Sequence, residues 1–85
     1  MFLLDARTPG EFRRGHMPGA VLIPMNEVPR RLAEIPGDRK IVVVCASGAR
    51  SAAVARFLDS RGYAWVGNYT EGVSGWVRVG LPLVR

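Results

Sequence analysis

One short segment of the sequence holds the residue types most able to carry out chemistry. The single cysteine, Cys45, ends an apolar run over residues 41–45 and is followed by four small residues and then Arg50. A helix is predicted from about residue 50 to residue 61. The N-terminal end of a helix stabilises a thiolate, which is the nucleophilic form of cysteine, so this spacing predicts a nucleophile at Cys45.

The residues after Cys45 are predicted to bind an anion. Consecutive backbone N–H groups of a tight loop that leads into a helix can converge on one point. Gly48 lets the loop fold back with unusual backbone angles, Ser47 adds a hydroxyl donor, and Arg50 adds a fixed charge. The predicted anion-binding residues are therefore Ala46, Ser47, Gly48, Ala49 and Arg50.

A structural role is the alternative for Cys45. Cysteine is common as a small buried hydrophobic residue, and the end of a strand is a typical place for it. Such a residue needs no glycine-containing loop of N–H groups behind it, so Gly48 and Arg50 favour the nucleophile.

The elements that would position this segment follow from the alternation of apolar runs and turn signals. Strands are predicted at residues 2–4, 20–23, 41–45 and 64–66. Helices are predicted at residues 9–14, 27–35, 50–61 and 72–79. This order favours an α/β fold with a mostly parallel central sheet flanked by helices on both faces. Ligands of such sheets bind beyond the carboxyl ends of the strands, where Cys45 lies.

Local signals predict helix ends and buried positions. Thr8 and Glu11 form a capping box for the first helix, and Gly15 ends it. Asn26 is predicted to cap the second helix, in which Pro29 is tolerated only in the first turn. The residues predicted to face the core are Ala53, Val54, Phe57, Leu58, Trp65, Val73, Trp76 and Val77.

Composition limits the protein to a few classes. Its 85 residues suggest a single domain over residues 1–85. The longest apolar run, at residues 41–46, is far shorter than the roughly 20 residues of a membrane-spanning helix, and no signal peptide is visible. One cysteine excludes an internal disulfide, a cysteine-rich zinc site and a CxxC redox pair. A lone thiol without an export signal is typical of the cytoplasm, so we expect a cytoplasmic protein without membrane association.

The charge pattern argues against nucleic-acid binding. The chain carries a net charge of +5 at pH 7, but its basic residues are dispersed along the sequence. No aromatic residues alternate with them as a stacking platform for bases would require. The charge is interpreted either as a solvated basic surface or as a positive field that attracts small anions.

Four segments carry motifs that are weak alone and specific together. LDARTPGEF at residues 4–12 fits L-D-[VA]-R-x-x-x-E-[FY], and GHMPGA at residues 15–20 is close to G-H-[IL]-P-G-A, with Met17 at the Ile or Leu position. VCASGARS at residues 44–51 fits [VY]-C-x-x-G-x-R-S. EGVSGW at residues 71–76, with GLP at residues 80–82, is close to G-G-[IV]-x-x-W…G-[LY]-P. In this order the segments resemble the motifs of rhodanese-like domains of the single-domain sulfurtransferase type.

The resemblance implies persulfide chemistry. In this family the cysteine at the position of Cys45 takes a sulfane sulfur from a small anionic donor and passes it to cyanide, a thiol or a protein. No metal or cofactor is implied. The implied supporting residues are Asp5 as an acceptor that holds the loop, Arg7 as an ion-pair partner, and Ser51. The chain has one cysteine, so the sulfur must be discharged to another molecule.

Two further positions bear on substrate and mechanism. Glu11 stands near the position where two-domain thiosulfate sulfurtransferases tend to have a substrate-binding arginine, which counts against thiosulfate as the physiological donor. His16 lies in a turn and is interpreted as a hydrogen-bonded structural residue rather than a general acid or base.

Other functions on the same fold are weighed against sulfur transfer. Phosphatases and arsenate reductases resemble C-x5-R, whereas Arg50 is the fifth residue after Cys45, so the shorter loop suits a sulfur better than a tetrahedral oxyanion. A non-catalytic interaction module would typically lack the nucleophile or the loop. A sulfur carrier for a partner enzyme would keep these residues, so the sequence leaves that alternative open.

The sequence departs from the family pattern at its start. It lacks the strand and helix that usually precede the first motif. A compact natural variant, a misassigned start and a domain trimmed from a longer protein are three explanations. A sheet edge or apolar face would be uncovered, so we expect a second copy to cover it in a weak homodimer.

Overall fold

A sheet of four parallel strands lies at the centre of the structure. The computed structural model describes residues 1–85, and the strands are β1 (Phe2–Asp5), β2 (Val21–Leu22), β3 (Ile41–Val44) and β4 (Val66–Asn68). Their order across the sheet is β2-β1-β3-β4, and each neighbouring pair is parallel. The predicted α/β class with a parallel sheet is confirmed.

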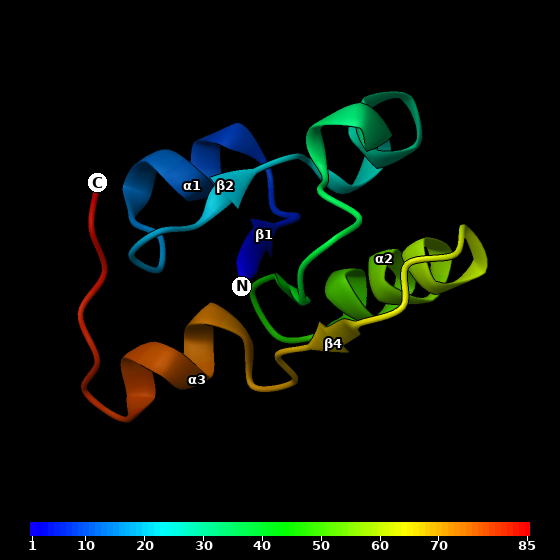
Figure 1. Cartoon of the computed structure of the whole chain (residues 1–85). Coiled ribbons are helices and arrows are strands. Elements are labelled where there is room, and N and C mark those ends of the chain that lie inside the picture. Colours follow the sequence, from blue (N-terminus) through cyan, green and yellow to red (C-terminus); the bar gives the residue numbers. More distant parts are fainter.

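Helices cover both faces of this sheet. They are α1 (Pro9–Arg14), the 3₁₀ helix η1 (Met25–Glu34), α2 (Ala49–Ser60) and α3 (Gly72–Arg78). Figure 1 shows η1 and α2 on one side of the sheet, and α1, α3 and the C-terminal segment on the other, as predicted. No helix combines the length and the apolar character that a membrane crossing requires.

The core consists of two unequal clusters. The larger cluster contains Leu4, Ala6, Ile23, Val28, Ile35, Ile41, Val43, Val54 and Leu58. The smaller cluster contains Met17, Val44 and Val73, with Leu3, Tyr69, Trp76 and Leu83 packed against it. Successive side chains of a strand point to opposite faces, so β3 contributes to both clusters. A strand covered on both faces is expected to be apolar at every position, as β3 is.

The ends of α1 match the signals in the sequence. The hydroxyl of Thr8 accepts a hydrogen bond from the N–H of Glu11 at 3.2 Å. The carboxylate of Glu11 accepts one from the N–H of Thr8 at 3.0 Å, which completes the capping box. Gly15 ends the helix, and its N–H donates to the carbonyl of Phe12. The prediction for residues 9–14 is confirmed.

The predicted α-helix at residues 27–35, with Asn26 as its cap, is wrong. The segment forms the 3₁₀ helix η1, which follows Pro24 and has no side-chain cap. Pro29 has no N–H to donate, and its ring crowds the preceding turn, so a continuous α-helix is disfavoured. Short 3₁₀ segments are compatible with these restrictions, and a kink at Arg31 joins two of them.

The fourth strand begins at Val66, two residues later than predicted. Trp65 is 65% exposed and Val77 is 50% exposed, so their predicted places in the core are wrong. β4 is an edge strand, and no further layer of side chains covers Trp65. The one face of α3 that meets the sheet is occupied by Val73 and Trp76, which leaves Val77 outside.

The outer side of β4 pairs with no other strand of the chain. An unpaired edge of this kind can accept a strand from another molecule. The second copy that we expect to cover an open edge stays a prediction.

Candidate active site

Cys45 lies directly after β3, at the carboxyl end of the strand, as the sequence predicts. It is 1% exposed, in front of the first turn of α2. The N–H of Gly48 donates to its Sγ at 3.1 Å and the N–H of Ser51 at 3.3 Å. The hydroxyl of Ser51 lies 3.3 Å from the same sulfur. The two amides at the N-terminal end of a helix stabilise a sulfur anion.

Two opposing effects set the pKa of Cys45. Burial raises the pKa because it disfavours the charged thiolate. Hydrogen bonds from the hydroxyl and the amide of Ser51, and the amides of Ser47 and Gly48, lower it. The hydrogen bonds outweigh burial, so the pKa of Cys45 lies below the ordinary value of a cysteine thiol.

The start of α3 holds the active-site loop, residues 45–48, from behind. The N–H of Val73 donates to the carbonyl of Cys45 at 2.8 Å, and the N–H of Ser74 donates to the carbonyl of Ala46 at 3.0 Å. These bonds engage the carbonyl groups of Cys45 and Ala46 and hold the loop against α3. No local signal in the sequence predicts this contact, because the two segments are far apart in the chain.

Two glycines allow these segments to approach each other. Gly72 has a φ of +65°, and a Cβ there would overlap the carbonyl of Ala46. Gly48 has a φ of +102°, and a Cβ there would lie 2.5 Å from the carbonyl oxygen of Thr70. Glycine alone combines the left-handed backbone with so close a contact, so the predicted need for Gly48 has two causes.

Asn68 is a supporting residue that the sequence analysis missed. Its Nδ2 donates to the carbonyl of Gly48 at 3.2 Å, and its Oδ1 accepts a hydrogen bond from the hydroxyl of Ser51. The Ser51 hydroxyl also lies 3.1 Å from the carbonyl oxygen of Gly48. A hydroxyl has one proton, so Ser51 can donate to Cys45 only by releasing these other acceptors. A polar residue at the end of a strand is the signal that could have found Asn68.

The Asp5–Arg7 ion pair is buried at the end of β1. The carboxylate of Asp5 accepts hydrogen bonds from the Nε of Arg7 at 3.0 Å and from its Nη2 at 2.8 Å, and Nη2 also donates to the carbonyl of Gly15. The predicted ion pair is therefore present. Asp5 makes no hydrogen bond to the active-site loop, so it fixes the turn between β1 and α1 rather than holding the loop directly.

Arg50 binds Glu11 instead of the sulfur. Its Nη1 and Nη2 donate to the two carboxylate oxygens at 2.8 and 2.9 Å. The hydrogen bond from Arg50 lowers the pKa of Glu11 to about 2, so this carboxylate stays ionised throughout the physiological range. The sequence predicts that Arg50 directs a fixed charge to the anion, whereas the structure shows that charge paired with a carboxylate.

The remaining predicted residues have simpler positions. Ser47 and Ala49 are exposed, and the Ser47 hydroxyl makes no hydrogen bond to the sulfur. The ring of His16 stacks on that of Phe12, with centroids 3.7 Å apart, and its Nδ1 lies 3.0 Å from the Phe12 carbonyl oxygen. These contacts support a structural role for His16. The structure contains no group of three or more His, Cys, Asp or Glu residues that could hold a metal ion.

The lowered pKa of Cys45 gives a testable pH dependence. The thiolate becomes populated as the pH rises through the pKa, so its ultraviolet absorbance should reach half its maximum at a lower pH than in free cysteine. Ser51→Ala removes the hydroxyl that can turn from Asn68 and Gly48 to donate to the thiolate, so the titration should shift to higher pH. Ser60→Ala, at the exposed end of α2, is the control and should leave it unchanged. A Ser51→Ala curve that matches the control would contradict the assigned role of Ser51.

Known proteins match this chain over nearly its whole length. The family model of the rhodanese-like domain matches residues 1–79. A sulfurtransferase of Allochromatium vinosum is 44% identical over 84 residues, which cover 99% of this chain and 78% of that protein. The chloroplastic thiosulfate sulfurtransferase 16 of Arabidopsis thaliana is 34% identical, with 93% and 76% of the two chains covered.

Other relatives are longer or are known as structures. The putative sulfur carrier protein YrkF of Bacillus subtilis is 36% identical, and the match covers 87% of this chain but 40% of that protein. The crystal structure of a rhodanese-related protein from Thermoplasma volcanium superposes with a TM-score of 0.91 and 32% identity, and covers 98% of this chain and 82% of that one. The names of several relatives support a general role in sulfur transfer. By its fold, its cysteine loop and these matches, the chain belongs to the rhodanese-like domain family.

Proposed function

We propose that this protein is a sulfurtransferase that moves a sulfane sulfur atom through a persulfide on Cys45. The observation that carries the proposal is the pair of N–H groups, from Gly48 and Ser51, that donate to the sulfur of Cys45 at the start of α2. The same donors that stabilise a thiolate also stabilise a persulfide anion.

The first step loads the cysteine. The Cys45 thiolate attacks the outer sulfur of a small donor, which is either thiosulfate or a persulfide. A new S–S bond forms as the donor's S–S bond breaks, and the electron pair leaves with sulfite or with a thiolate. No external oxidant or reductant is consumed, because the sulfane sulfur brings its oxidation state with it.

The second step discharges the persulfide. A thiophilic acceptor, which is cyanide, a thiol or a protein, attacks the outer sulfur, and Cys45 leaves as the thiolate. The chain has no second cysteine to act as an internal acceptor. The acceptor must therefore enter from solution, and we propose that this takes place in a reducing compartment such as the cytoplasm.

Intact mass spectrometry tests the proposal. Incubation with thiosulfate or benzyl hydropersulfide should add the mass of one sulfur atom, and cyanide should then remove it. A protein that gains no sulfur from any of these donors would contradict sulfur transfer and favour an interaction module without catalytic activity.

A sulfur carrier is the second candidate function. The relative named as a putative sulfur carrier favours it. The two candidates differ in the acceptor, so the transfer rate to cyanide should be compared with the rate to protein thiols. Faster transfer to protein thiols favours the carrier.

A further inference from the structure

We propose that Asn68 is a positioning residue for the reaction of Cys45. It holds the hydroxyl of Ser51 away from the sulfur while the sulfur is uncharged, and releases the hydroxyl when the sulfur becomes an anion. This role rests on the proposed sulfur transfer and adds a residue that acts on Cys45 only through Ser51. It is carried by a chain of hydrogen bonds that joins the three side chains.

The chain of hydrogen bonds runs from the sulfur to Asn68. The thiol of Cys45 donates to the Oγ of Ser51 over 3.3 Å. The hydroxyl of Ser51 has one proton, which it donates to the Oδ1 of Asn68. The Nδ2 of Asn68 donates to the carbonyl of Gly48 at 3.2 Å, and this bond determines which end of the amide faces Ser51. In the thiol state the Ser51 proton is therefore held by Asn68.

The carbonyl of Gly48 competes weakly for this proton. It lies 3.1 Å from the Ser51 hydroxyl. However, it already accepts the N–H of Ala52 at 3.0 Å and the Nδ2 of Asn68, which together occupy its two lone pairs. Asn68 is therefore the main acceptor for the Ser51 hydroxyl while Cys45 is a thiol.

Loss of the thiol proton reverses the preference of the hydroxyl. A thiolate cannot donate to Ser51, and as a charged acceptor it binds a hydroxyl more strongly than a neutral amide oxygen does. Ser51 and Cys45 are 0% and 1% exposed, so water does not take the place of the hydroxyl at the sulfur. Asn68 is half-buried and lines a surface recess, so water can bind its Oδ1 once the hydroxyl has turned away.

The position of the hydroxyl follows the charge on Sγ through both steps of the transfer. During loading the Cys45 thiolate forms a bond to the outer sulfur of the donor, and the electron pair of the broken S–S bond leaves with the donor. Sγ then carries no charge, and the hydroxyl of Ser51 returns to Asn68. During discharge the acceptor takes the outer sulfur, and the electron pair of the S–S bond returns to Sγ. The hydroxyl turns back and stabilises the leaving thiolate.

Asn68→Ala is expected to favour the thiolate. It removes an acceptor that the hydroxyl uses in the thiol state and gives up in the thiolate state. The midpoint of the thiolate titration, followed by ultraviolet absorbance, should move to lower pH by roughly half to one pH unit, because one neutral hydrogen bond is lost. If Asn68 only kept the loop in shape, its loss would loosen the amides around the sulfur and raise the midpoint. The sign of the shift therefore distinguishes the two roles.

The charged groups around the site are unchanged in this variant. Arg50 and Arg7 lie closest to the loop, and each is paired with a carboxylate. The charged side chains on the elements around Cys45 and Asn68 are Asp5, Arg7, Glu11, Arg50, Arg56, Asp59 and Glu71. Because Asn68→Ala alters none of these charges, a shift of the midpoint reports the lost hydrogen bond.

A double-mutant cycle tests whether Asn68 acts through Ser51. In the Ser51→Ala background the hydroxyl is absent, so Asn68→Ala should leave the midpoint unchanged. An equal shift in both backgrounds would show that Asn68 acts on the sulfur without Ser51 and would overturn the inference.

Asn68→Asp carries the same test if Asn68→Ala does not fold. A carboxylate should hold the Ser51 hydroxyl more strongly and repel the thiolate, so the midpoint should move to higher pH. The shift should be smaller in the Ser51→Ala background, where only the repulsion remains. A shift of the same size in both backgrounds would contradict a role through Ser51.

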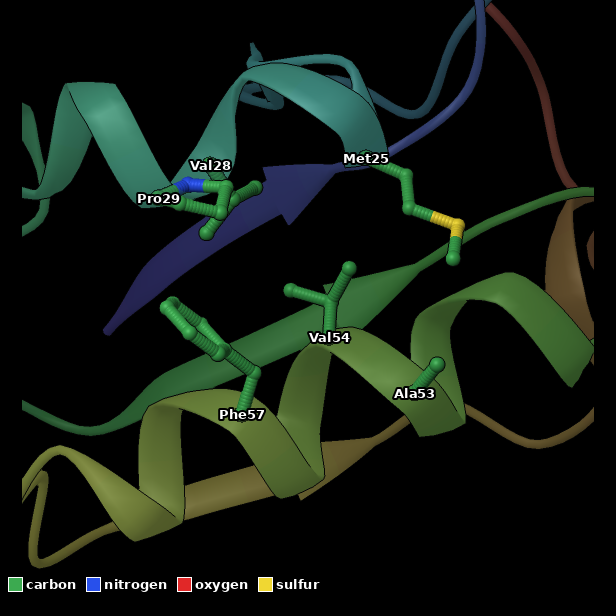
Figure 2. Close-up of a pocket in the computed structure, with 6 residues that line it drawn as sticks. All are labelled: Met25, Val28, Pro29, Ala53, Val54 and Phe57. Carbon is green, nitrogen blue, oxygen red and sulfur yellow. The ribbon is translucent and has the colours of Figure 1, made fainter.

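A variant on another side of α2 is the control. Asn68 shares its recess with Ala52, Ala55, Arg56 and Asp59 of this helix. An apolar groove between η1 and α2 is lined from α2 by Ala53, Val54 and Phe57, which Figure 2 shows facing η1. Ala53→Ser adds a hydroxyl two residues from Ser51 but outside its hydrogen bonds, so the midpoint should not change.

The outcomes separate this inference from the proposed function, because the titration needs no sulfur donor. If Asn68→Ala folds and does not lower the midpoint, the inference is wrong and sulfur transfer stands. If the cycle gives the expected shifts but no donor loads Cys45, the proposed function alone is wrong. If thiosulfate loads Cys45, the pH profile of the loading rate should shift with the titration. A profile that does not follow it would overturn the role of Asn68 in the transfer.

Discussion

Cys45→Ser is expected to abolish sulfur loading. Serine keeps nearly the same shape and can accept the hydrogen bonds from Gly48 and Ser51, but its oxygen cannot form a persulfide. Incubation with a donor that loads the wild-type protein should add no mass to this variant. Production of thiocyanate from cyanide should fall to the uncatalysed background, a loss on the order of a thousandfold or more.

The variant also identifies where the sulfur resides. The chain has one cysteine, so no other side chain can carry a persulfide in its place. Urea unfolding should show that Cys45→Ser remains folded, which separates loss of chemistry from loss of structure. Sulfur that still binds to the folded variant would show that Cys45 is not the carrier.

Asp5→Asn is expected to cause the largest loss of stability. Asp5 and Arg7 are 0% and 6% exposed, and the substitution leaves the guanidinium buried without its counter-charge. Removing one partner of a buried ion pair typically costs about 3–5 kcal/mol. A domain of this size has a free energy of unfolding of roughly 4–13 kcal/mol, so the loss is a large part of the total. Urea unfolding at low temperature, followed by circular dichroism, measures it.

An exposed ion pair provides the control for Asp5→Asn. Glu34 pairs with Arg31 at 2.8 Å on the surface of η1, where water screens the charges. Glu34→Gln should therefore change the free energy of unfolding very little. If Asp5→Asn lost no more stability than Glu34→Gln, the buried pair would contribute no more than a surface pair.

The positions that sequence analysis predicted well depend on neighbours within a few residues. The capping box at α1 joins Thr8 and Glu11, three residues apart, so their types and spacing suffice to predict it. Cys45 at the end of an apolar strand, before a glycine and a helix, is equally local. The strand–loop–helix order alone placed the cysteine at the N-terminal end of α2.

Local patterns failed where the outcome depended on packing or on the backbone of a single residue. Trp65 is apolar and follows a turn, which favours burial, yet it precedes an edge strand with nothing beyond it. Pro29 is compatible with the first turn of an α-helix, but the segment adopts a 3₁₀ form. The residue type of Trp65 does not show whether other side chains cover it. The residue type of Pro29 does not show which form of helix the segment adopts once its N–H is missing.

The sequence by itself determined the position of Cys45 between its strand and helix, the parallel α/β fold and the family, because each follows from residue types at short, regular spacings. Only the tertiary structure decided what surrounds Cys45. The order β2-β1-β3-β4 places β3 between β1 and β4, so the loop after β3 meets the segments that follow both neighbours. For this reason Glu11 reaches Arg50 across 39 residues, and α3 binds the carbonyl groups of the active-site loop. Such contacts depend on which strands become neighbours, and no local spacing in the sequence specifies that order.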